Sequence, residues 1–88
     1  MNNYKVVIKN SAKGDLKKIK HSNLKSNFDE VIQTLQENPF LQTQSFEKLS
    51  PKSTERYSRR LNRQHRVVYK VNENLKQVVI YSAWTHYE

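Results

Sequence analysis

The chain has 88 residues and no cysteine, which suits a single domain over residues 1–88 and excludes disulfide bonds and thiolate catalysis. Its formal net charge is +8, so a polyanion is the favoured partner, chiefly nucleic acid, although an acidic protein would also fit. No apolar run approaches the ~20 residues of a membrane-spanning helix, and the N-terminus lacks the apolar run of a signal peptide. A cytoplasmic protein is therefore expected.

The basic residues are unevenly placed along the chain. Of the sixteen lysines and arginines, seven lie in residues 5–25 and eight in residues 48–70, whereas residues 26–47 contain none and hold four acids. This division predicts a molecule with one basic side.

The first half of the chain predicts one strand and two helices. Residues 4–9 (YKVVIK) are β-branched, and their consecutive apolar residues predict a strand buried on both faces. A helix with a thin apolar stripe follows, with Asn10 or Ser11 as its N-cap and Asp15 in its first turn. A second helix ends before Pro39, because the residue before a proline disfavours helical geometry. Its stripe is the clearest periodic signal in the chain: Leu24, Phe28, Val31, Ile32 and Leu35.

The second half predicts strands. Residues 40–56 form a polar connection with room for a short turn of helix, and a hairpin follows over residues 57–71. Residues 78–84 (VVIYSAW) are apolar at successive positions, which predicts a central strand. The expected order is β-α-α-β-β-β, an α+β fold in which a helical hairpin backs a twisted, antiparallel-rich sheet.

The hairpin carries a dense group of arginines. If its loop is residues 62–64, Leu61 lies opposite His65, and Arg60 and Arg66 become direct neighbours on one face. Like charges at such positions destabilise a sheet by about 0.2–1 kcal/mol, so the pair is either an anion site or two solvated side chains. A four-residue loop would place the two arginines on opposite faces.

The remaining chemical groups suit cleavage of RNA without a metal ion. No pair of histidines has metal-ligand spacing, and one glycine cannot build a phosphate-binding loop. Cleavage would need a base for the ribose 2′-hydroxyl, cations for the phosphate and an acid for the leaving oxygen. Candidates in that order are Glu47, the pair Arg60 and Arg66, and His86, with Tyr57, Tyr87 and Trp84 as stacking surfaces.

Structural interpretations compete with these roles. Glu47 could be a surface carboxylate paired with Lys48, His65 is favoured as structural, and Trp84 as a core residue. From the residues alone, a basic nucleic-acid-binding domain and a ribonuclease fit about equally well.

Five short motifs stand out in the chain: Asn38-Pro39-Phe40, Glu47-Lys48-Leu49, Tyr57-Ser58-Arg59-Arg60, His65-Arg66-Val67-Val68-Tyr69 and His86-Tyr87. Together they resemble the motifs of the YoeB/Txe toxins, a branch of the RelE-like superfamily in bacterial toxin–antitoxin modules. The similarity covers nearly the whole chain, and the combination of motifs is specific although each motif alone is weak.

The resemblance implies a ribosome-dependent messenger-RNA endonuclease that cuts in the decoding site, leaves a cyclic phosphate and uses no cofactor or metal. It places the base on Glu47, the phosphate-binding arginines on Arg60 and Arg66, the acid on His86 and an orienting tyrosine on Tyr87. Four further residues are expected to contact the RNA: Lys48, Tyr57, Arg59 and Arg63.

The resemblance also implies partners. One is an acidic YefM/Phd-like antitoxin, and operator DNA would be bound only through this antitoxin. By analogy with the family, the other is a second copy of the chain in a homodimer. Two features depart from the family pattern: Lys48 replaces a frequent proline, and Glu88 follows the terminal His-Tyr pair. The competing interpretations are a non-catalytic RNA-binding module of the same fold and, last, a DNA-binding regulator, for which no helix–turn–helix is evident.

Overall fold

The computed structural model describes residues 3–49, 55–63 and 65–86, without the side chains of residues 85 and 86. In this part of the chain, five strands form one sheet in the order β1-β5-β4-β3-β2. β1 runs parallel to β5, and the other neighbouring pairs are antiparallel. The elements are β1 (Lys5–Ile8), α1 (Asn10–Lys20), α2 (Lys25–Glu37), β2 (Glu47–Lys48), β3 (Arg56–Arg60), β4 (His65–Asn72) and β5 (Gln77–His86).

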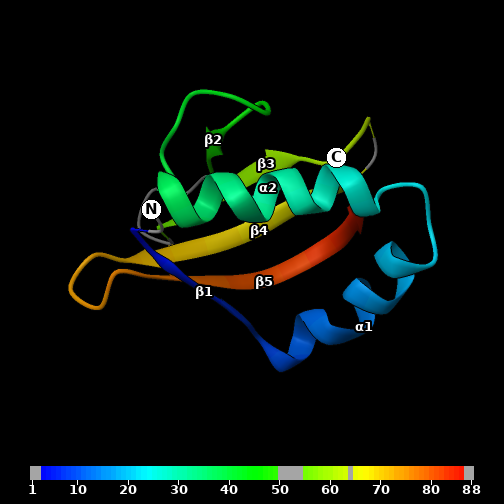
Figure 1. Ribbon diagram of the computed structural model, residues 1–88, viewed down its shortest axis with the longest axis horizontal. Helices are drawn as coiled ribbons and strands as arrows, with labels where there is room; N and C mark the ends of the chain where they lie inside the picture. Colours follow the sequence, from blue (N-terminus) through cyan, green and yellow to red (C-terminus); the bar gives the residue numbers. More distant parts are fainter. Residues whose placement is uncertain (1–2, 50–54, 64, 87–88) are drawn as a thin grey trace.

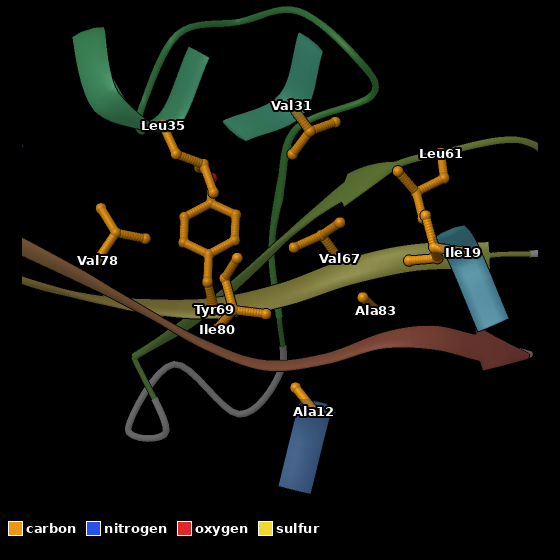
Figure 2. Close-up of a cluster of buried hydrophobic side chains, with 10 residues drawn as sticks. All are labelled: Ala12, Ile19, Val31, Leu35, Leu61, Val67, Tyr69, Val78, Ile80 and Ala83. Carbon is orange, nitrogen blue, oxygen red and sulfur yellow. The ribbon is translucent and has the colours of Figure 1, made fainter. Parts of the chain in front are cut away.

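The core lies between the helices and the central strands. In Figure 1, α2 crosses the sheet in front of β4, while α1 lies beside the end of β5. Leu35 and Val31 of α2 point toward Tyr69 and Val67 of β4 (Figure 2). The buried core cluster consists of Ala12, Ile19, Val31, Leu35, Leu61, Val67, Tyr69, Val78, Ile80 and Ala83.

The predicted α+β fold and the central position of β5 are confirmed. The prediction that the first strand is buried on both faces is wrong, because β1 lies at the edge of the sheet and Val6, Val7 and Ile8 are only half-buried. No helix in the described ranges is long and apolar enough to cross a membrane.

The connection before the hairpin, for which the sequence allowed a short turn of helix, contains a short strand instead. Glu47 and Lys48 pair with Ser58 and Tyr57 of β3, so the two-residue strand β2 extends the sheet. This strand holds Glu47 beside the arginine-rich hairpin, which is its main consequence for function.

The predicted cap of the first helix is also wrong. Helix α1 begins at Asn10, its N-cap is Lys9, and no side chain caps it. Ser11 donates its hydroxyl to the carbonyl of Tyr81 at 3.1 Å, and the carboxylate of Asp15 accepts the Ala83 N–H at 3.1 Å. Both polar groups therefore fasten α1 to β5 and leave the helix terminus uncapped.

Candidate active site

The turn between β3 and β4 fixes the positions of the arginines. The Leu61 N–H donates to the carbonyl of His65 at 2.8 Å, and the His65 N–H donates to Oδ1 of Asn62 at 2.8 Å. Leu61 and His65 therefore close the turn, and Arg60 pairs directly with Arg66, which is one of the two arrangements that the sequence left open.

Alternation along the two strands defines two faces. The core face, which α2 covers, carries Tyr57 and Arg59 of β3, Leu61 directly after β3, and Val67 and Tyr69 of β4. The opposite face is called the cationic face here and carries Arg56, Ser58 and Arg60 of β3 and Arg66, Val68 and Lys70 of β4.

Glu47 joins this cationic face through its pairing with Ser58. Its Oε2 accepts from Nη1 of Arg66 at 3.2 Å, and the same Nη1 donates to Oγ of Ser58 at 3.3 Å. The Glu47 side chain is 58% exposed, whereas that of Arg66 is only 14% exposed. The Glu47 carboxylate therefore pairs with Arg66, whereas the alternative interpretation had paired it with Lys48. The exposed side of the carboxylate is open to a ligand.

The end of β5 approaches the same place by its backbone. Thr85 pairs with Arg66, and His86 pairs with His65. The side chain of His86 and the whole of Tyr87 lie outside the described residues. Their convergence with Glu47 and the two arginines stays a prediction.

Two aromatic residues at this end of the sheet have structural positions. The rings of His65 and Trp84 stack with their centroids 4.1 Å apart, and Trp84 packs against the core. His65 projects to the opposite face from Arg66, in agreement with the structural role predicted for it.

Three of the four expected RNA contacts lie at or near the surface. Lys48 and Arg63 are exposed. The ring of Tyr57 is half-buried, because it stacks on Phe46 at 5.5 Å and meets Phe40 edge-on at 5.4 Å. Only part of the Tyr57 ring is therefore available to a base.

The fourth expected contact, Arg59, is contradicted by the structure. Arg59 is fully buried on the core face. Its guanidinium donates to the hydroxyl of Tyr69 at 3.1 Å and to the carbonyls of Pro39 and Thr43 at 2.8 and 2.9 Å. The Tyr69 hydroxyl donates in turn to the Pro39 carbonyl at 2.6 Å, and burial raises the pKa of Tyr69 to about 12. Arg59 therefore fastens residues 39–43 to the sheet and cannot reach RNA.

The sequence interpretation missed the hydroxyl of Ser58, which is fully buried and orients Arg66. The strand register gives the signal: once Arg60 is placed opposite Arg66, Ser58 falls on the same face two positions away.

Comparisons with known proteins agree with this geometry. Residues 9–87 match the family model of the YoeB-like toxin of bacterial type II toxin–antitoxin systems. A comparison with curated proteins gives no match.

Solved structures give the same result. A YoeB–YefM complex from Staphylococcus aureus contains a chain of 30% identity and TM-score 0.77, with 96% of this chain and 98% of that chain covered. A YoeB dimer from the same organism gives 27% identity and TM-score 0.81, with 97% and 99% covered. A YoeB/ParE toxin from Agrobacterium tumefaciens shares the fold at TM-score 0.83 and 22% identity, with 94% and 99% covered. The chain thus belongs to the YoeB-like toxins of bacterial type II toxin–antitoxin systems.

Proposed function

We propose that this toxin is a ribosome-dependent endonuclease that cuts messenger RNA in the decoding site and thereby inhibits translation. The observation that carries the proposal is the Glu47–Arg66 pair on the cationic face, directly beside Arg60. A base and two planar cations are thereby gathered on one accessible surface.

The two arginines bind the scissile phosphate. Guanidinium groups donate in a planar fork that fits phosphate oxygens, and fixed cations stabilise the charge of a phosphorane-like transition state. The Ser58 hydroxyl restrains Arg66 at 3.3 Å, so this guanidinium is partly oriented before RNA arrives. Cleavage then requires no resident metal ion.

Glu47 acts as the general base. In the free protein its carboxylate accepts a hydrogen bond from Nη1 of Arg66. A phosphate that binds there competes with the carboxylate for this donor. Displaced from Arg66, the carboxylate takes the proton of the ribose 2′-hydroxyl. The oxygen attacks the phosphorus, the bond to the 5′-oxygen breaks, and a 2′,3′-cyclic phosphate results.

His86 protonates the leaving 5′-oxygen, and Tyr87 orients the RNA. The backbone of His86 ends β5 beside the hairpin, which supports this assignment. Lys48, Tyr57 and Arg63 contribute further contacts to the strand.

The test is cleavage of a defined messenger RNA on programmed bacterial ribosomes. The wild type is compared with Glu47→Gln and His86→Ala. The matched control is Glu30→Gln, which makes the same carboxylate-to-amide change at an exposed position of α2. A cut in the decoding site that persists in the control and disappears in the two variants supports the proposal.

The second candidate function is a non-catalytic RNA-binding module of the same fold, favoured by the net charge of +8. Tight RNA binding without any cut by the wild type would favour this candidate and would reject the endonuclease proposal.

The partner of the free toxin is an acidic antitoxin similar to YefM, through which the pair binds operator DNA and the toxin acts as co-repressor. The YoeB–YefM complex from Staphylococcus aureus supports this partner, and the YoeB dimer from that organism supports a homodimer. Ribosomes and messenger RNA place the activity in the cytoplasm. Acidic side chains on the cationic face would make antitoxin binding weaken as salt rises, and salt-independent affinity would contradict this contact.

A further inference from the structure

A second group of cations surrounds one aromatic ring on the sheet. Tyr81 of β5 is half-buried, and its ring centroid lies 4.5 Å from Nζ of Lys9, 4.8 Å from Cζ of Arg56 and 5.9 Å from Nζ of Lys70. The three cations come from separate segments: Lys9 lies between β1 and α1, Arg56 begins β3, and Lys70 belongs to β4. The negative face of the ring attracts them electrostatically, so one tyrosine gathers three like charges.

Among the described residues, these charges have no acidic partner. Arg56 and Lys70 are direct cross-strand neighbours, an arrangement that is unfavourable without a counter-charge. Within residues 3–49, 55–63 and 65–86, no carboxylate oxygen lies within 4.0 Å of these three cations. The cluster is therefore a concentrated positive charge that a bound anion would stabilise.

The cluster lies on the same face as the candidate active site. Arg56 and Arg60 are four residues apart on β3, a distance of about 13 Å along a strand. The sequence thus repeats a pair of opposed cations, Arg56 with Lys70 and Arg60 with Arg66, along one hairpin. A short single-stranded segment can contact both pairs.

A hollow of about 560 Å³ adjoins the cluster, lined by Lys48, Lys70 and Tyr81 among others. Two acids also line it, Glu55 and Glu73. The Glu73 carboxylate accepts from Nζ of Lys76 at 3.1 Å and from the Tyr4 hydroxyl at 2.8 Å, so its charge is already compensated. The side of the hollow formed by Lys48, Lys70 and Tyr81 is the one suited to an anion.

We propose that Lys9, Arg56 and Lys70, gathered around Tyr81, form a second phosphate subsite that binds the same RNA strand outside the cleavage centre. The choice of RNA as the ligand rests on the proposed function. Phosphate oxygens bridge the cations, while the ring holds them together. The continuity with Arg60 and Arg66 favours an RNA strand over an acidic peptide.

Binding of a 2′-O-methylated single-stranded RNA 12-mer, measured by fluorescence anisotropy at several salt concentrations, tests the subsite. This RNA lacks the attacking hydroxyl, so the result does not depend on cleavage. The double variant Arg56→Ala/Lys70→Ala is expected to bind about tenfold more weakly and to lower the slope of log K against log salt by about 0.7 for each lost phosphate contact.

The matched control is Lys17→Ala/Lys18→Ala, which removes two exposed charges from α1 and is expected to change affinity less than twofold. Tyr81→Leu is expected to weaken binding about threefold to tenfold, because the cations disperse, whereas Tyr81→Phe keeps the ring and the affinity. Circular dichroism confirms that each variant is folded.

Equal weakening by the control would overturn the subsite in favour of general charge attraction. Unchanged RNA affinity of the double variant would also overturn the subsite. Weaker binding of that variant to an acidic antitoxin would then assign the cluster to the antitoxin, and weaker binding to empty ribosomes would assign it to ribosomal RNA. The two proposals can also fail separately. If the double variant binds RNA more weakly but the wild type cuts no messenger RNA on ribosomes, the proposed function is rejected and the subsite is kept.

Discussion

Arg59 and Arg60 are adjacent in one strand and have opposite environments. Arg59 is fully buried on the core face, where its guanidinium donates to the Tyr69 hydroxyl and to the carbonyls of Pro39 and Thr43. Arg60 is exposed on the cationic face, where its cross-strand neighbour is Arg66. The alternation of a strand thus gives one arginine to the fold and the next to a ligand.

The two faces also differ in how charge is compensated. Neutral oxygens from a loop and a tyrosine satisfy the buried guanidinium of Arg59 on the core face, which makes its burial tolerable. The cationic face opposes cation to cation twice and holds one described carboxylate in an ion pair, that of Glu47. Stability is therefore concentrated on one face, and the capacity to bind an anion on the other.

The largest expected effect is on the cationic face. Arg66→Ala should lower cleavage on programmed ribosomes by about 10²–10⁴-fold, the range for loss of one charge-stabilising group. The free energy of unfolding should also fall, by about 1–3 kcal/mol, because the Arg66 side chain is only 14% exposed and its removal leaves the buried Ser58 hydroxyl without this donor. Lys18→Ala on α1 is the control, and an Arg66→Ala rate within threefold of wild type would reject the role.

On the core face the expected effect falls on stability. Arg59→Ala should lower the free energy of unfolding by about 3–5 kcal/mol, because it leaves buried oxygens without a donor and opens a cavity. Urea denaturation measures this, with Arg63→Ala, an exposed change in the β3–β4 loop, expected to stay within about 0.5 kcal/mol. A loss below 1 kcal/mol in Arg59→Ala would show that residues 39–43 are held in another way.

The next prediction concerns alkaline pH. Burial raises the pKa of Tyr69 from 10.0 to about 12, so the native state keeps a proton that the unfolded state loses. The stabilisation is complete below pH 10 and is lost as the pH rises from 10 to 12, by about 1.4 kcal/mol per unit and about 2–3 kcal/mol in total.

Unfolding of the wild type and of Tyr69→Phe by urea across pH 9–12 isolates this contribution, because the other titrating groups are shared. The variant should be less stable at pH 9 and should show a shallower decline above pH 10. Parallel curves for the two proteins would contradict the raised pKa.

The smallest effect tests the cost of opposed cations. Arg60→Thr should raise the free energy of unfolding by about 0.2–1 kcal/mol, since it removes the repulsion with Arg66. The same variant should cleave messenger RNA more slowly. A destabilised Arg60→Thr would indicate that the pair is already compensated in the free protein.

Local patterns predicted the elements that are long or fixed by a turn. The stripe ending at Leu35 predicted α2. The opposition of Arg60 and Arg66 was one of two arrangements that the loop length left open, and the hydrogen bond between Leu61 and His65 selects it. Both signals are local in sequence, so tertiary packing had little power to override them.

Other features depended on distant contacts. Strand β2 has only two residues and is defined by its pairing with Ser58 and Tyr57 of β3. A segment this short has no hydrophobic periodicity from which a strand could be predicted. Asp15 resembled a first-turn acid but accepts the Ala83 N–H from 68 residues away. The burial of Arg59 followed from alternation with Tyr57 and Leu61, yet the density of positive charge favoured a surface position.

The most direct test of the account is the NMR signal of each arginine Nε–Hε group, followed while 2′-O-methylated single-stranded RNA is added. Individual Arg→Lys variants assign the signals. The account predicts that the signals of Arg60 and Arg66 shift on binding, whereas that of Arg59 stays in place because its Nε already donates to Tyr69. A shift of Arg59 comparable to theirs, or unmoved Arg60 and Arg66 signals at RNA saturation, would contradict the division of the sheet into a core face and an RNA-binding face.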